Sequence, residues 1–124
     1  MKNNLLNQII IIFFIIINSS ANSSEQFNFD VTEIEIVDKG NIYKGLNRGT
    51  ITTNDGIELK ADEFEYNKGL NILEANGNVK IKDTINKYVI FSDKITYLKN
   101  KNIIITNGNS RAIEEDSNIT IKAN

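Results

Sequence analysis

The sequence predicts an all-β domain, and three observations carry that prediction. The segments IELKAD, YVIFSD and ITIKAN begin at residues 57, 88 and 119, so one unit recurs every 31 residues. Such a period is typical of stacked repeats, in which one unit cannot bury its apolar face alone. From residue 27 onward, apolar and polar residues alternate with period two between clusters of Asn, Gly and Lys, and no helical spacing is sustained.

The candidate strands follow one another along most of the chain. They are Val31–Val37, Thr50–Thr53, Gly56–Lys60, Glu63–Tyr66, Ile72–Ala75, Asn78–Lys82, Tyr88–Phe91, Lys94–Tyr97, Ile103–Thr106 and Ile119–Lys122. They are rich in Ile, Val, Phe, Tyr and Thr, the residue types that favour half-buried strands. The triplet Asn54-Asp55-Gly56 predicts a hairpin turn, because these residues tolerate a positive φ.

One face of the predicted sheet is apolar. Between residues 73 and 82 the odd positions hold Leu, Ala, Gly, Val and Ile, whereas the even positions hold Glu, Asn and Lys. Gly77 falls on the apolar side, where a strand glycine often marks a bulge or a close backbone approach. We therefore expect a corner of the sheet at Gly77, and we interpret the Gly-Asn pairs at 40–41, 77–78 and 108–109 as backbone devices at corners.

Other polar positions recur with the repeat. Asp62 and Asp93 are expected at turns, where they cap backbone donors rather than bind a metal. Tyr66 and Tyr97 are expected to pack inward with hydroxyls that reach a rim or water. The acidic cluster at 114–116 predicts a solvated loop, with calcium binding as the alternative.

Composition excludes several function classes. The chain has no Cys and no His, which removes disulfides, thiol nucleophiles, His relays and the usual zinc ligands. Its 14 basic and 16 acidic residues are interspersed without a basic run, so no nucleic-acid footprint is visible. No nucleophile-base pair or clustered acid pair can be named. We predict a protein that is not an enzyme and that uses no cofactor and no metal.

The N-terminus predicts a secretory signal. Residues 1–7 carry one Lys, Ile9–Ile17 is unbroken apolar chain, and the segment that follows is small and polar. The apolar run is shorter than the roughly 20 residues that span a bilayer. Cleavage is expected after Ala21, which leaves residues 22–124 as one β domain. The alternative is an uncleaved anchor built from residues 5–17.

Two segments resemble a known hallmark. ADEFEYN at 61–67 and ANGNVKI at 75–81 are similar to the motif of the organic-solvent-tolerance (OstA-like) domain, found in the periplasmic lipopolysaccharide-transport proteins LptA and, at its N-terminus, LptD. A looser second copy contains Ser92, Asp93, Tyr97, Gly108 and Asn109. The resemblance extends from about Phe29 to the end, and the segment 29–49 is closer to an LptD N-terminal segment.

The resemblance implies an open β-jelly roll of stacked, V-shaped antiparallel strands. Its inner face would be a hydrophobic groove that shields the acyl chains of lipid A during transfer to the outer membrane. It implies a location in the periplasm, with association with the outer membrane as a further option. Its partners would be lipopolysaccharide and other Lpt jelly-roll proteins, joined by head-to-tail strand addition. The lipid-binding residues expected on the inner face are Ile57, Leu59, Phe64, Tyr66, Leu73, Val79, Ile81, Ile90, Ile95, Tyr97 and Ile104.

Several alternatives stay open at this point. The chain stops inside a repeat, which indicates either a fragment or a terminal edge meant for strand addition to a neighbour. The residues do not separate an LptA-type bridge from an LptD fragment. An extracytoplasmic structural β-repeat module would have a fully packed interior, and an LptC-like protein would keep its N-terminus as an inner-membrane anchor.

Overall fold

The computed structural model describes residues 27–117 and 119–123, which form one antiparallel sheet of nine strands. Among these residues there is no α-helix, and two short 3-10 turns, η1 (Asp38–Gly40) and η2 (Lys99–Lys101), connect strands. The strands are β1 (Asn28–Val37), β2 (Ile42–Thr52), β3 (Ile57–Ala61), β4 (Glu63–Asn67), β5 (Ile72–Asp83), β6 (Tyr88–Leu98), β7 (Ile103–Asn107), β8 (Ser110–Glu114) and β9 (Ile119–Ala123). The predicted signal peptide, 1–21, lies outside the described residues.

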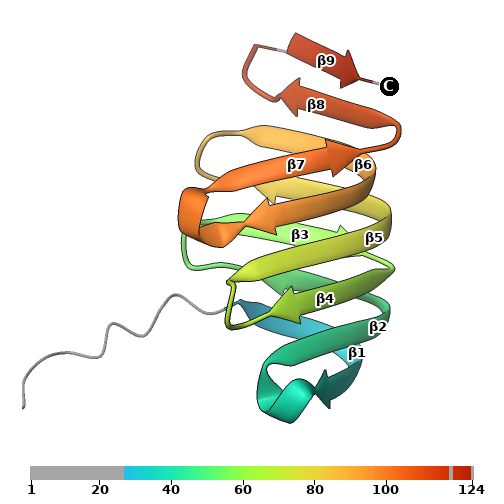
Figure 1. The fold of residues 1–124 in the computed structure, drawn as a ribbon. Helices are drawn as coiled ribbons and strands as arrows, with labels where there is room; N and C mark the ends of the chain where they lie inside the picture. The colour runs from blue at the N-terminus through green and yellow to red at the C-terminus, as the bar shows by residue number, and fades with distance from the viewer. Residues whose placement is uncertain (1–26, 118, 124) are drawn as a thin grey trace, which may run out of the picture.

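The sheet is folded lengthwise into two halves. The long strands β2, β5 and β6 each pair with two short ones: β2 and β5 both pair with β4 at one half and with β3 at the other, and β6 pairs with β8 and then β7. We call the part that contains β4 and β7 half-sheet A, and the part that contains β3, β8 and β9 half-sheet B. The strands stack from β1 at one end of the molecule to β9 at the other (Figure 1).

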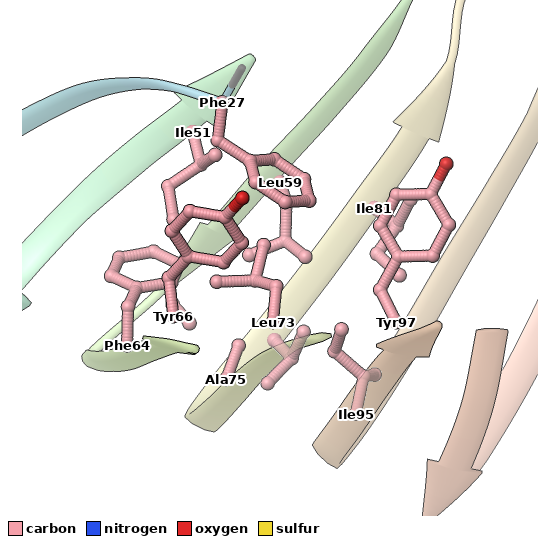
Figure 2. Packing of buried hydrophobic residues seen from close by; sticks show 12 residues of the cluster. Phe27, Ile51, Leu59, Phe64, Tyr66, Leu73, Ala75, Ile81, Ile95 and Tyr97 are labelled. Carbon is pink, nitrogen blue, oxygen red and sulfur yellow. The ribbon is translucent and has the colours of Figure 1, made fainter. Parts of the chain in front are cut away.

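The two half-sheets face one another across an apolar interior. The ring of Phe29, in half-sheet B, lies 6.3 Å from Tyr43 and 5.9 Å from Tyr66, both in half-sheet A. The buried core draws on both halves (Figure 2) and consists of Phe27, Ile51, Leu59, Ala61, Phe64, Tyr66, Leu73, Ala75, Val79, Ile81, Ile95 and Tyr97. Full burial of one large aliphatic side chain contributes about 1.5–3 kcal/mol, so this interior is the main source of stability.

The predicted strands need three corrections. Residues 42–49 belong to β2 and were missed because Gly and Asn interrupt their alternation; β8 was not predicted because its residues, SRAIE, do not alternate between apolar and polar types. The predicted strands at 72–75 and 78–82 are one strand, β5, and those at 88–91 and 94–97 are one strand, β6. A shift of register between Asn76 and Val79 bends β5 without ending its pairing with β6. β1 also begins at Asn28 rather than at Val31.

Candidate functional site: the apolar interior and its mouth

The predicted inner-face residues meet in one cluster. Of the eleven, Ile57, Ile90 and Ile104 are half-buried and pack against the core. The other eight are buried within it: Leu59, Phe64, Tyr66, Leu73, Val79, Ile81, Ile95 and Tyr97. Period-two alternation therefore assigned these side chains to the correct face. Their burial also shows that the side chains of the chain itself fill the interior in this structure.

Sequence reasoning missed the aromatic residues at the start of the domain. Phe27 is buried, and its ring centroid lies 4.8 Å from Tyr66 and 5.9 Å from Tyr97. Figure 2 shows the Phe27 ring beside that of Tyr66. The alternation Phe27-Asn28-Phe29 was the sequence feature that could have predicted two inward-facing rings, as the structure has them. It was missed because the predicted strand began only at Val31.

A corner separates the two half-sheets, and it repeats with the sequence period. At Gly77 the chain has φ +78°, and the next side chain, Asn78, donates a hydrogen bond of 2.8 Å to Asp62 Oδ2. One repeat later Gly108 has the same φ, and Asn109 donates to Asp93 Oδ2 at 2.7 Å. The predicted corner at Gly77 is confirmed.

Two interpretations of the corner residues need correction. The carboxylates of Asp62 and Asp93 accept hydrogen bonds from Asn side chains, whereas we expected them to cap backbone donors. Gly40-Asn41 lies in the connection between β1 and β2 and not at the corner. Hydrogen bonds from Arg48, at 2.6 Å, and from Asn78 hold the pKa of Asp62 below its usual value.

The side opposite the corner is the mouth of the interior, where the strands of both half-sheets end. The Tyr66 hydroxyl donates to Asn71 Oδ1 at 3.0 Å, and the equivalent Tyr97 hydroxyl donates to Asn102 Oδ1 at 3.4 Å. Both Asn residues occupy turns with positive φ at the ends of half-sheet A. The prediction of buried tyrosine rings with hydroxyls at a rim is confirmed.

An ion pair joins the two half-sheets across the mouth. Lys99 Nζ, from η2 at the end of half-sheet A, lies 2.5 Å from Asp55 Oδ2, in the turn at the end of half-sheet B. The Lys99 side chain is only 7% exposed. Burial is the largest single influence and opposes the charge on both groups, but hydrogen bonding and charge attraction together outweigh it, so the pKa of Asp55 is lowered and that of Lys99 is raised.

The apolar interior continues to both ends of the stack. At the β1 end, Ile34 and Ile36 are 43% and 58% exposed, and Ile36 pairs with the inward-facing Tyr43. At the β9 end, Ile119 and Ile121 are 54% and 66% exposed. Ile121 pairs with Ala112, which in turn pairs with Ile90, a residue that packs against the core. The interior is therefore closed along its length and exposed at its two ends.

The acidic cluster at 114–116 does not converge on a common point. Glu115 forms an ion pair with Lys82 at 3.5 Å, whereas Glu114 accepts hydrogen bonds from the hydroxyls of Ser117 and Tyr88. Within 27–117 and 119–123, no three acidic, His or Cys side chains gather into a group that could hold a metal ion. The described part of the chain contains no helix with the length and apolar character needed to cross a bilayer.

Comparison of the sequence with protein-family models and with curated proteins finds no match.

Proposed function

We propose that this protein is a lipopolysaccharide carrier of the OstA-like type, a jelly roll of V-shaped strands that shields lipid A acyl chains on the way to the outer membrane. The observation that carries the proposal is the apolar strip between the half-sheets, which runs from Ile36 at one end to Ile121 at the other. A strip of this kind suits a flexible hydrocarbon chain better than a polar ligand.

The physical chemistry of burial supports transfer along the strip. Removing one methylene group from water contributes about 0.8 kcal/mol, and this attraction has no preferred direction. An acyl chain can therefore advance along aliphatic side chains without breaking directed bonds. The sequence has no nucleotide-binding motif, so a partner must supply any energy for directed movement.

Lipid access requires a rearrangement of the packed side chains, because the interior is filled. Phe27 packs over the tyrosine rings, and the pair of Asp55 with Lys99 holds the half-sheets together. We infer that the acyl chains enter where these two contacts separate. Alternatively, they enter from the exposed isoleucines at the ends of the stack.

The free strand edges support the proposed partners. Within the described sheet, β1 pairs only with β2, β7 only with β6 and β9 only with β8. Unpaired edges at opposite ends suit head-to-tail strand addition to other Lpt jelly-roll proteins. A periplasmic location follows if residues 1–21 act as a signal peptide.

A second candidate function has one observation in its favour. The interior is packed along its length, as in a structural β-repeat module that takes up no lipid. The two candidates predict different behaviour of the same inner surface.

Site-specific photo-crosslinking in cells separates them. The probe replaces Ile104 or Ile90, which are half-buried on the inner face, and Ile105, which is exposed on the outer face of the same strand as Ile104. Adducts with lipopolysaccharide from the two inner positions alone support the carrier. Folded protein that gives no adduct supports the structural module, and equal adducts from Ile105 contradict a specific inner groove.

A further inference from the structure

A row of basic side chains crosses the outer face of half-sheet B. The cross-strand register places Lys60 opposite Lys80, Lys80 opposite Phe91, Phe91 opposite Arg111, and Arg111 opposite Lys122. We call these five residues the basic row. The four cations come from four strands, and all four are exposed. The chain as a whole has a net charge of −2, so this concentration of positive charge is local.

The charge of the basic row is largely uncompensated. Lys60 pairs with Glu58 at 3.1 Å, but among the described residues Lys80, Arg111 and Lys122 form no ion pair. Like charges directly opposite one another destabilise a sheet. The row therefore costs stability in the protein alone, and a bound anion would relieve that cost.

Phe91 orders the row without neutralising it. Its ring lies 4.7 Å from the Arg111 guanidinium carbon and 5.8 Å from Lys80 Nζ, within the range of cation-π attraction. A carboxylate at position 91 would hold the same two cations but cancel their charge. The aromatic ring instead leaves them available to a ligand, and hollows of about 320 Å³ and 360 Å³ lie on its two sides.

Carboxylates border the row on both sides. Asp62 and Asp93 lie along the corner, and Glu58 and Glu115 lie toward the mouth. A flat anionic membrane would meet these acidic groups together with the cations. A single extended chain would contact the row alone. Neighbouring strands are about 4.8 Å apart, a spacing close to the length of one sugar unit and shorter than the phosphate spacing of a single-stranded nucleic acid.

We propose that the basic row binds an extended acidic polysaccharide whose sulfate, phosphate or carboxylate groups contact Lys80, Arg111 and Lys122. Arg111 and Lys122 are one strand apart and suit groups on neighbouring sugars, whereas Lys80 and Arg111 are two strands apart and suit groups on alternate sugars. The site is on the outer surface, away from the apolar interior. It is independent of the proposed lipid carriage, and neither proposal requires the other.

The test measures binding of the full chain to dextran sulfate by titration calorimetry, with uncharged dextran as the ligand control. The row variant combines Lys80→Gln, Arg111→Gln and Lys122→Gln. We expect it to bind about tenfold more weakly, at about two- to threefold for each exposed cation. We also expect its slope of log K against log salt to be shallower by about 2 to 3, as loss of three ionic contacts requires.

A matched variant removes the same charge elsewhere on the outer surface. It combines Lys44→Gln, Lys82→Gln and Lys94→Gln, whose side chains pair with Glu65, Glu115 and Glu74. This variant should bind nearly as well as the parent, and Phe91→Leu should bind about two- to fivefold more weakly through loss of the cation-π contacts. Circular dichroism melts confirm that each variant is folded.

Three results would overturn the proposal. One is unchanged binding by the row variant, and another is an equal loss in the matched variant, which would indicate attraction by overall charge alone. The third is tighter binding to single-stranded DNA or to phosphatidylglycerol vesicles than to dextran sulfate, which would assign the row to a different ligand class.

Discussion

Asp55 Oδ2 and Lys99 Nζ lie 2.5 Å apart, although the two residues are 44 positions apart in the chain. The pair connects the ends of the two half-sheets, on the side opposite the corner at which the long strands bend. It therefore closes the interior on the side where, within residues 27–117 and 119–123, no strand continues from one half-sheet into the other. The stability of the closed form depends on this pair and on the packing of Phe27 beside it.

Asp55→Asn should destabilise the fold at neutral pH. Loss of a hydrogen bond to a buried charged group costs about 1–3 kcal/mol. Because the pKa of Asp55 is lower in the folded state, its stabilisation is present above the ordinary pKa of about 3.9 and is lost as pH falls below it. Because the pKa of Lys99 is raised, its share is present below about pH 10 and is lost at higher pH.

Urea unfolding at pH 7 and pH 3 measures this difference. The gap between parent and variant should shrink at pH 3, and an undiminished gap would show that the ion pair is not its source. Glu58→Gln, which breaks the exposed pair with Lys60, is the control and should cost less than about 1 kcal/mol.

Gly77→Ala should destabilise the corner. An added Cβ would lie 2.6 Å from Asp62 Oδ2, and the residue has φ +78°, where an L side chain is strained. We expect a loss of about 1–3 kcal/mol in the free energy of unfolding. Gly40→Ala is a matched control, because Gly40 also has a positive φ but nothing lies within 4 Å of its added Cβ. Equal losses in both variants would remove the contact with Asp62 as the cause.

Leu73→Ala tests whether the interior acts as a packed core. Leu73 is fully buried, and truncation of such a residue costs about 2–5 kcal/mol through lost burial and the cavity left behind. Leu70→Ala, at a side chain that is 63% exposed, should change stability by less than about 0.5 kcal/mol. Chemical denaturation of the two variants gives the comparison. A small loss at Leu73 would indicate an interior that collapses readily around the missing atoms.

Head-to-tail assembly can be tested with introduced cysteines, since the chain has none. Mixing Ile36→Cys protein with Ile104→Cys protein under mild oxidation should yield mixed disulfide dimers, because strand addition would place β1 of one molecule beside β7 of the next, and Ile36 and Ile104 end the same cross-strand row of half-sheet A. Ile36→Cys mixed with Leu70→Cys should yield few, and non-reducing gels measure both. Equal yields would point to random collision.

The candidate site was predictable to the extent that it depends on local pattern. Alternation in β3, β4 and β5 assigned Leu59, Tyr66 and Ile81 to one face, and all three are buried. The repeat also predicted that Tyr66 and Tyr97 occupy equivalent positions. Each hydroxyl donates a hydrogen bond to the Asn that lies five residues later in the chain. Local pattern failed where glycines and polar residues interrupt a strand, as in the first half of β2.

Long-range relationships were outside the reach of local pattern. Asp55 stood out only as a turn residue, and local pattern gave Lys99 no role, because a sequence does not specify which turns meet when a sheet folds over. The basic row was missed for the same reason, since its members come from four separate strands and no basic run exists along the chain.

By itself, the sequence determined the repeat, the strand-rich class, the inward-facing residues and the glycine corner, because each of these depends on side chains within a few residues of one another. The tertiary structure alone decided the closure of the mouth by Asp55 and Lys99, the packing of Phe27 on Tyr66, and the alignment of Lys80, Arg111 and Lys122 across the sheet. The physical reason is that register and folding of the sheet set these contacts, and both are properties of the whole chain.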